Sequence, residues 1–111
     1  MVRKEDRVEH KNSEKCMAFE YPMGDKDINI AEILINGRYP DTGSVVNEEV
    51  KEIVFVTGGE GKIVVEGKEY ELKKCDSILL LPKQKYFFEG DSLQIITACS
   101  PAWRPEQHKN I

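Results

Sequence analysis

The stretch that decides the fold runs from Glu52 to Asp91 and reads EIVFVTGGEGKIVVEGKEYELKKCDSILLLPKQKYFFEGD. Short runs rich in Val, Ile, Leu, Phe and Tyr are separated there by turn-forming residues, which is the pattern of strands in a sandwich or barrel. Glu66 and Gly67 stand between two alternating runs, where a glycine can adopt the positive φ that a two-residue hairpin requires. We expect Gly59-Glu60-Gly61 and Gly90-Asp91 to form turns as well.

Strand signals continue on both sides of this stretch. The expected strands are Cys16–Tyr21, Ile28–Asn36, Lys51–Thr57, Lys62–Glu66, Lys68–Leu72, Ser77–Leu81, Lys85–Phe88 and Leu93–Cys99. Ile28–Asn36 is mostly apolar, which predicts a strand buried on both faces. No segment has a long helical period, and only Pro105–His108 is expected to form a single helical turn, with proline at its first position. Because closing the sheet protects its edges, we predict a single all-β domain, 1–111, folded as a jelly-roll barrel.

Length and composition favour one soluble globular domain. The 111 residues suffice for one hydrophobic core and are too few for two. The net charge is −4 and no basic stripe is present, so nucleic acid is not an expected partner. No apolar run is long enough to cross a bilayer, and the N-terminus lacks a signal core, so we expect a cytoplasmic protein without membrane contact. The three widely spaced cysteines are expected to be reduced thiols.

The spacing of several residues resembles that of the cupin superfamily. In the first cupin motif a glutamate is followed, after six residues, by a glycine, as Glu52 is followed by Gly59. In the second motif Pro82 holds the place of the proline. The remaining places of that motif, which are glycine, glycine, histidine and asparagine in the family, are held by Asp76, Gln84, Phe87 and Asp91. The resemblance covers roughly residues 28 to 101 and implies a double-stranded β-helix, the cupin form of the jelly roll.

The same resemblance argues against the metal that many cupins bind. Those cupins hold their metal with three histidines and one glutamate. The histidines of the first motif would fall at Val45 and Asn47, or at Val46 and Glu48, and none of these residues is histidine. Only Glu52 of the four ligands is present, and one carboxylate without imidazole partners does not hold a transition metal tightly. We therefore expect no metal and no other cofactor.

Four residues are candidates for a ligand-binding site, because they occupy or adjoin the places where the family's metal ligands converge. They are Glu52, Asn47, Tyr86 and Phe87. Burial would raise the pKa of Glu52 and make it a candidate general acid or base, whereas a neighbouring lysine or solvent contact would leave it unremarkable. Asn47 would orient a ligand, or would be an ordinary loop residue. Phe87 would form an apolar wall beside Tyr86, or would simply fill the core.

Residues outside these motifs are expected to be structural. His10 and His108 lie in the terminal segments and are predicted to be at the surface. Cys99 ends the last strand without a basic partner nearby in the sequence, which favours a structural thiol over a nucleophile. Trp103 is expected to pack against one end of the barrel or to cover a pocket.

These features favour a small metal-independent cupin that binds a small molecule in its barrel. Two alternatives remain open. One is a metal-independent isomerase or lyase that uses Glu52 as acid or base, and the other is a structural or regulatory module that associates with itself. A homodimer would use the apolar strand from Ile28 to Ile35. Glu52 and Phe87 on opposite faces of the barrel wall, or a solidly packed interior, would end the binding-pocket hypothesis and favour the structural module.

Overall fold

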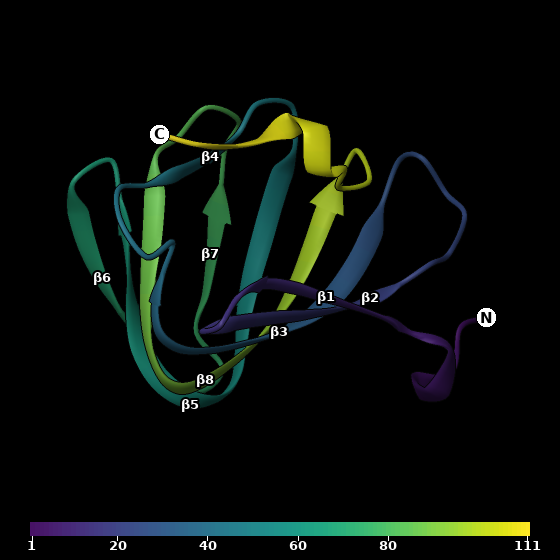
Figure 1. Ribbon diagram of the computed structural model, residues 1–111, viewed down its shortest axis with the longest axis horizontal. Coiled ribbons are helices and arrows are strands. Elements are labelled where there is room, and N and C mark those ends of the chain that lie inside the picture. The colour runs from purple at the N-terminus through teal and green to yellow at the C-terminus, as the bar shows by residue number, and fades with distance from the viewer.

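The chain folds into one antiparallel sheet that curls on itself, as the computed structural model of residues 1–111 shows (Figure 1). The strands are β1 (Val8–Ser13), β2 (Cys16–Tyr21), β3 (Asn29–Tyr39), β4 (Val45–Asn47), β5 (Lys51–Val65), β6 (Lys68–Leu72), β7 (Ser77–Leu80), β8 (Tyr86–Ser100) and β9 (His108–Asn110). Two single 3-10 turns, η1 (Lys4–Asp6) and η2 (Pro105–Gln107), are the only helical elements, so the all-β prediction is confirmed. No helix is long and apolar enough to span a membrane.

Two long strands, β5 and β8, hold the sheet together. They pair with each other from Lys51↔Ser100 at one end to Val65↔Tyr86 at the other, and they run side by side through a bend in Figure 1. On the outer side of β8 lie β3, β2 and β1 in succession, while β5 also pairs with β7 and β6. The short strand β4 joins β8 to β9. The bend brings these flanking strands around one interior, which makes the sheet a barrel.

The expected turns at Gly59-Glu60-Gly61 and Gly90-Asp91 are wrong, because both segments lie inside the continuous strands β5 and β8. The strands are bent there by shifts in pairing register between Val56 and Glu60. Gly59 has a φ of 67°, and a Cβ at this position would lie 1.9 Å from the carbonyl oxygen of Ser92. Glycine is therefore needed for the close approach of the two strands at the bend.

The two-residue turn at Glu66 and Gly67 is confirmed. It joins β5 to β6, and both residues have positive φ, at 49° and 80°. This is the type I′ geometry, whose twist matches that of the flanking strands. The predicted boundaries of β2 and β6 and the helical turn that begins at Pro105 are also confirmed.

Strand alternation divides the residues of the long strands between the interior and the outer surface. In β5, Val54 and Val56 are fully buried, whereas Ile53 and Phe55 are exposed. The prediction that Ile28–Asn36 is buried on both faces is wrong. Ala31 and Ile35 face inward, but Ile28, Ile30 and Leu34 are exposed, because no other part of the chain covers the outer side of this sheet. The core fills one part of the barrel and leaves the remainder for a cavity.

Two glycines allow the turn and the bend to be tested separately. Gly67→Val is expected to cost about 1–3 kcal/mol, since the added side chain meets no atom within 4 Å and only the positive φ opposes it. Gly59→Ala is expected to cost more, because its Cβ would also collide with the backbone of β8. Urea denaturation of the two variants measures both costs. A smaller loss for Gly59→Ala than for Gly67→Val would show that the bend is not tightly packed.

Candidate functional site

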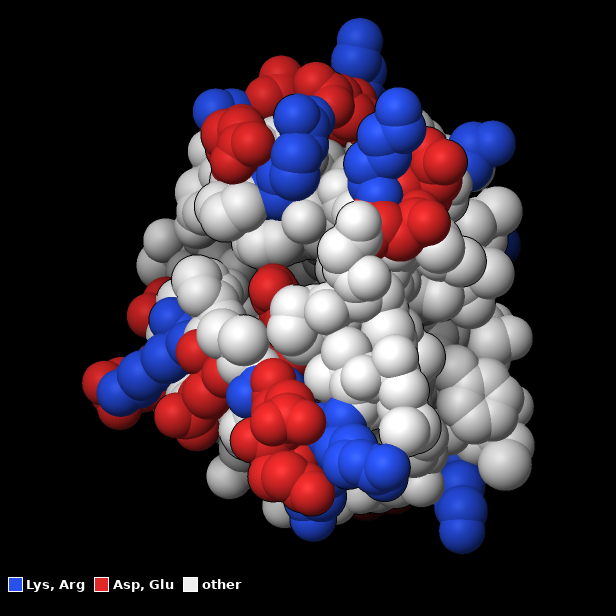
Figure 2. All heavy atoms as spheres, turned by 90° about the vertical axis from the view of Figure 1, so that its right-hand side faces the viewer, with Lys and Arg blue, Asp and Glu red and all other residues white.

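A cavity opens inside the barrel between the inner faces of β3, β5 and β8. It contains about 590 Å³ of space that no atom fills, part of which is open solvent at the mouth. The lining is mostly apolar, and the face that carries the β2–β3 connection is hollowed at its centre, with atoms of an acidic residue visible inside (Figure 2). The polar side chains of the lining include His10, Glu20, Tyr39, Glu52, Tyr86, Thr97 and His108. Such a concave apolar site with a few polar groups is typical of small-molecule binding.

Glu52 is the buried carboxyl group of this cavity. It lies on β5 opposite Cys99 of β8, with a side chain that is 6% exposed. Both hydrogen bonds of the carboxyl group go to Oε1, one from Asn47 Nδ2 at 3.3 Å and one from the Cys99 thiol at 3.6 Å. Every fully sealed side-chain nitrogen or oxygen in the structure has a hydrogen-bond partner. The second oxygen of Glu52, Oε2, therefore faces the open space of the cavity.

Burial raises the pKa of Glu52 to about 7, and the hydrogen bonds from Asn47 and Cys99 offset only part of this effect. The lining contains no lysine or arginine that would favour the charged form. The sequence left open that Glu52 would pair with a basic side chain or would reach solvent freely. The structure agrees with neither interpretation. A carboxyl group that titrates near neutral pH can either accept or donate a proton, which is the requirement for general acid–base catalysis.

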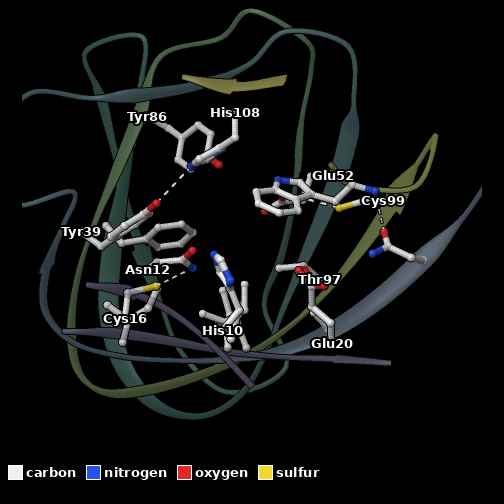
Figure 3. Close-up of a pocket in the computed structure, with 18 residues that line it drawn as sticks. His10, Asn12, Cys16, Glu20, Tyr39, Glu52, Tyr86, Thr97, Cys99 and His108 are labelled. Carbon is white, nitrogen blue, oxygen red and sulfur yellow. Dashed lines mark hydrogen bonds between the residues drawn. The ribbon is translucent and has the colours of Figure 1, made fainter. Parts of the chain in front are cut away.

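The predicted surface position is wrong for His108, which is half-buried, and is confirmed for His10, which is exposed at the mouth of the cavity. Both side chains line the cavity. Figure 3 shows the His10 ring pointing into the space between Tyr39 and Thr97. The terminal strands β1 and β9 bring these residues to the barrel, and no strand was predicted for either segment, because both are short and mostly polar.

His108 is held by hydrogen bonds at both ring nitrogens. Nδ1 lies 2.9 Å from Asn47 Oδ1, and Nε2 lies 3.1 Å from the Tyr39 hydroxyl (Figure 3). Burial lowers the pKa of His108 to about 4, so its ring is neutral at pH 7. Trp103 lies close to both histidines, with its ring centroid 5.5 Å from that of His108 and 6.3 Å from that of His10. Trp103 therefore borders the mouth of the cavity, which agrees with the interpretation that it covers a pocket.

The four residues expected in the site do not all reach it. Glu52 and Tyr86 line the cavity. Asn47 is 1% exposed and lies behind Glu52, where its amide nitrogen and its amide oxygen are both hydrogen-bonded to protein partners. Phe87 faces the opposite side of β8, with the Arg38 guanidinium 4.0 Å from its ring centroid. Glu52 and Phe87 thus lie on opposite faces of the barrel wall, so the pocket predicted from these two residues is wrong, an outcome that counts in favour of the structural module. The interior is nevertheless not solidly packed, and Phe88 forms the apolar wall of the cavity that the structure contains.

A β-bulge in β8 explains the error at Phe87. The inward residues Leu93, Ile95, Thr97 and Cys99 follow a simple alternation, which would place Phe87 inward if it continued. However, Ile35 pairs with Leu93 and Gly37 with Gly90, so two residues of β8, Asp91 and Ser92, lie opposite the single residue Asn36 of β3. The additional residue reverses which side chains face inward beyond it. Hence Tyr86 and Phe88 point to the interior.

The two buried thiols have no partner that would activate them. Burial raises the pKa of Cys16 to about 11 and that of Cys99 further, in part because Glu52 lies nearby. The Cys99 thiol donates a hydrogen bond to Glu52 Oε1. Both therefore serve as neutral lining groups rather than nucleophiles.

The residues of the cavity do not fit the metal of the cupin motif. No group of three or more His, Cys, Asp or Glu side chains is placed to hold an ion. The polar groups nearest Glu52 Oε1 are an amide and a protonated thiol, which are poor ligands for a transition metal.

Glu52 and His108 impose opposite pH dependences on stability. The pKa of Glu52 in the folded chain, about 7, is raised above its ordinary 4.5. Its stabilising contribution is present below pH 4.5 and is lost as the pH rises to 7. The pKa of His108, about 4, is depressed below its ordinary 6.5, so its contribution is gained as the pH rises between these values. The two windows overlap, and the effects partly cancel in the wild-type chain.

Glu52→Gln is expected to remove the contribution of Glu52 and leave that of His108. The free energy of unfolding of the variant should therefore rise as the pH rises from about 4 to 6.5. The difference in unfolding free energy between wild type and variant should fall by about 3 kcal/mol from pH 4.5 to 7, the equivalent of the pKa shift of Glu52. Urea denaturation across this range measures it, with the exposed Glu60→Gln as control. A difference that stays constant with pH would refute the raised pKa.

No family model and no curated protein sequence matches the chain. Among solved structures, the chain is similar to Pac13, described as a unique nucleoside dehydratase. The TM-score is 0.88 at 14% identity, with 100% of this chain and 89% of Pac13 covered. Variants of Streptomyces PAC13 have been solved with uridine.

Other similar structures extend the comparison. KdgF from a Halomonas species has a TM-score of 0.75 at 13% identity, with 96% of each chain covered. An RmlC-like cupin from Shewanella frigidimarina has a TM-score of 0.75 at 16% identity, covering 96% of this chain and 93% of the other. At such identities the likeness establishes the architecture alone. The double-stranded β-helix expected from the sequence is confirmed, and the chain has the cupin fold.

Proposed function

We propose that this chain binds a small molecule in its barrel and moves a proton on it with Glu52, as a metal-independent lyase or isomerase. The observation that carries the proposal is the placement of one carboxyl oxygen, Oε2, in an apolar cavity while Oε1 is held by Asn47 and Cys99. A carboxyl group fixed in this way needs little reorganisation to exchange a proton with a bound ligand.

Several features of the lining support proton transfer without a metal. The pKa of Glu52, about 7, allows both the acid and the base to be populated at neutral pH. The Tyr86 and Thr97 hydroxyl groups line the same cavity and can donate hydrogen bonds to an oxygen that gains charge in the reaction. Phe88 and Ile95 exclude water from the floor, which strengthens these interactions.

The comparison with Pac13 supports a lyase in particular. A dehydratase eliminates water, and such an elimination needs a base that removes a proton from a carbon atom of the substrate. The uridine bound by Streptomyces PAC13 variants makes uridine a suitable first probe of this cavity. An aromatic ligand ring would find Trp103 and His108 at the mouth and Phe88 further inside.

The test uses chelator-treated protein and the isosteric variant Glu52→Gln. We expect wild type to bind uridine in calorimetry and to catalyse solvent deuterium exchange on members of a nucleoside and aldose panel. Glu52→Gln should lower the exchange rate by about 10²–10⁴-fold, the usual contribution of a general base, and leave binding within about tenfold. Phe87→Leu, outside the cavity, is the matched control. Exchange that survives in Glu52→Gln, or that appears only when a metal is added, would refute the proposal.

We also propose that a second copy of this chain covers the outer face of the sheet. Pairing register places four apolar residues in one row across β7, β5, β8 and β3, namely Leu79, Ile53, Ala98 and Ile30. Ile53 and Leu79 are 49% and 51% exposed, and Phe55 beside them is 42% exposed. Because the row carries no charge, a two-fold axis can bring it against itself without repulsion. The strand expected to form a dimer interface, β3, contributes its exposed side to this row.

Ile53→Lys is expected to convert a dimer into a monomer, because it places a charge at the middle of the row in both copies. Sedimentation equilibrium measures the mass, and Val8→Lys on β1 is a control at a site of similar exposure away from the row. A wild-type chain that remains monomeric at its highest soluble concentration would contradict the dimer.

A further inference from the structure

One hydrogen-bonded chain of side chains connects the backbone near the barrel rim to both walls of the cavity. It begins at the backbone N–H of Glu49, which can only donate, and which lies 3.3 Å from Gln107 Oε1. The Gln107 oxygen is thereby the acceptor, so its other amide atom, Nε2, is the donor directed at Asn47 Oδ1 at 3.1 Å. Gln107 and Asn47 are 2% and 1% exposed, so water does not offer them alternative partners.

The orientation of Asn47 follows from this anchor. Its Oδ1 accepts from Gln107, so its Nδ2 is the atom that faces Glu52 and donates to Oε1 at 3.3 Å. The same Oδ1 lies 2.9 Å from His108 Nδ1, and an oxygen without a proton requires a donor there. His108 consequently carries its proton on Nδ1.

The remaining bond fixes Tyr39. His108 is neutral at pH 7, so once Nδ1 carries the proton, Nε2 has only a lone pair. The Tyr39 hydroxyl, 3.1 Å from Nε2, must then donate its proton to His108. The hydroxyl oxygen of Tyr39 retains free lone pairs on the cavity side, and no proton remains for a ligand.

We infer that Asn47 and His108 are positioning residues that fix the direction of every hydrogen bond between Tyr39 and Glu52, and that the cavity therefore selects a neutral polyol with hydroxyl donors for both walls. Tyr39 presents an acceptor oxygen on one wall, and the Glu52 carboxylate presents Oε2 on another (Figure 3). A diol on an otherwise apolar or ring-shaped body satisfies both acceptors when Glu52 is ionised, whereas a carboxylate or phosphate ligand in the same position would meet the lone pairs of Tyr39 and the charge of the ionised Glu52. This ligand class rests on the proposed function, while the directions of the hydrogen bonds do not.

The first experiment tests the directions of the hydrogen bonds and needs no ligand. Heteronuclear NMR of the His108 ring at neutral pH distinguishes the two neutral tautomers, with the variant His10→Gln used to assign the signals. We expect the proton on Nδ1. Asn47→Asp should keep this tautomer, because an oxygen still faces His108, and should raise the pH at which Glu52 ionises, because Glu52 loses its donor and gains a second carboxylate. A proton on Nε2 in the wild type, or an unchanged titration of Glu52 in Asn47→Asp, would overturn the inference.

The second experiment tests the ligand class with uridine and its dideoxy analogue, which lacks both hydroxyls of the ribose diol. Tyr39→Phe should weaken uridine binding by about three- to tenfold, the worth of one hydrogen bond, and should leave binding of the dideoxy analogue unchanged. Tyr70→Phe, an exposed tyrosine on β6, is the matched control. Equal weakening of both ligands by Tyr39→Phe would overturn the selection of a diol. Failure of the wild type to bind either ligand, with the Nδ1 tautomer in place, would count against the proposed function and the ligand class and leave the hydrogen-bond directions standing.

Discussion

The pairing of β5 with β8 along their whole length is the constraint on which the rest of the structure depends. It sets Glu52 opposite Cys99 at one end and Tyr86 opposite Val65 at the other. Glu52 and Tyr86 therefore line the same interior. The bend in the middle needs Gly59, because any side chain there would strike the backbone of β8. A single continuous ladder thus provides the curvature, the floor of the cavity and its acidic group.

Burying a carboxyl group without a cation beside it costs free energy, and hydrogen bonds from neutral groups offset part of that cost. Asn47 and Cys99 donate to one oxygen of Glu52, and Asn47 is held in turn by Gln107 and His108. Neutral dipoles of this kind stabilise the charged form only in part, which is why the pKa of Glu52 stays raised. The result is a group near its titration point in a dry cavity, an arrangement suited to proton transfer rather than to tight metal binding.

The chain ends complete the site. The first and last strands, β1 and β9, contribute His10 and His108 to the rim, while the segment before η2 contributes Trp103. Val45 and Asn47 of β4 hold one of the two pairs of places that the motif spacing allows for histidines. The imidazole that approaches Asn47 comes from the C-terminal strand β9. Asn47 in turn donates a hydrogen bond to Glu52.

Local pattern alone determined the β class and the hairpin at Gly67 and made Glu52 a candidate, because alternation, turn chemistry and motif spacing all act over short stretches of sequence. Only the tertiary structure decided the remainder. The reversal that turns Phe88 inward in place of Phe87 arises from a bulge, which depends on how β8 pairs with β3. The placement of His108 against Tyr39 depends on contacts between residues 69 positions apart, which no local pattern encodes. The directions of the hydrogen bonds in the site likewise follow from partners that meet only when the barrel closes.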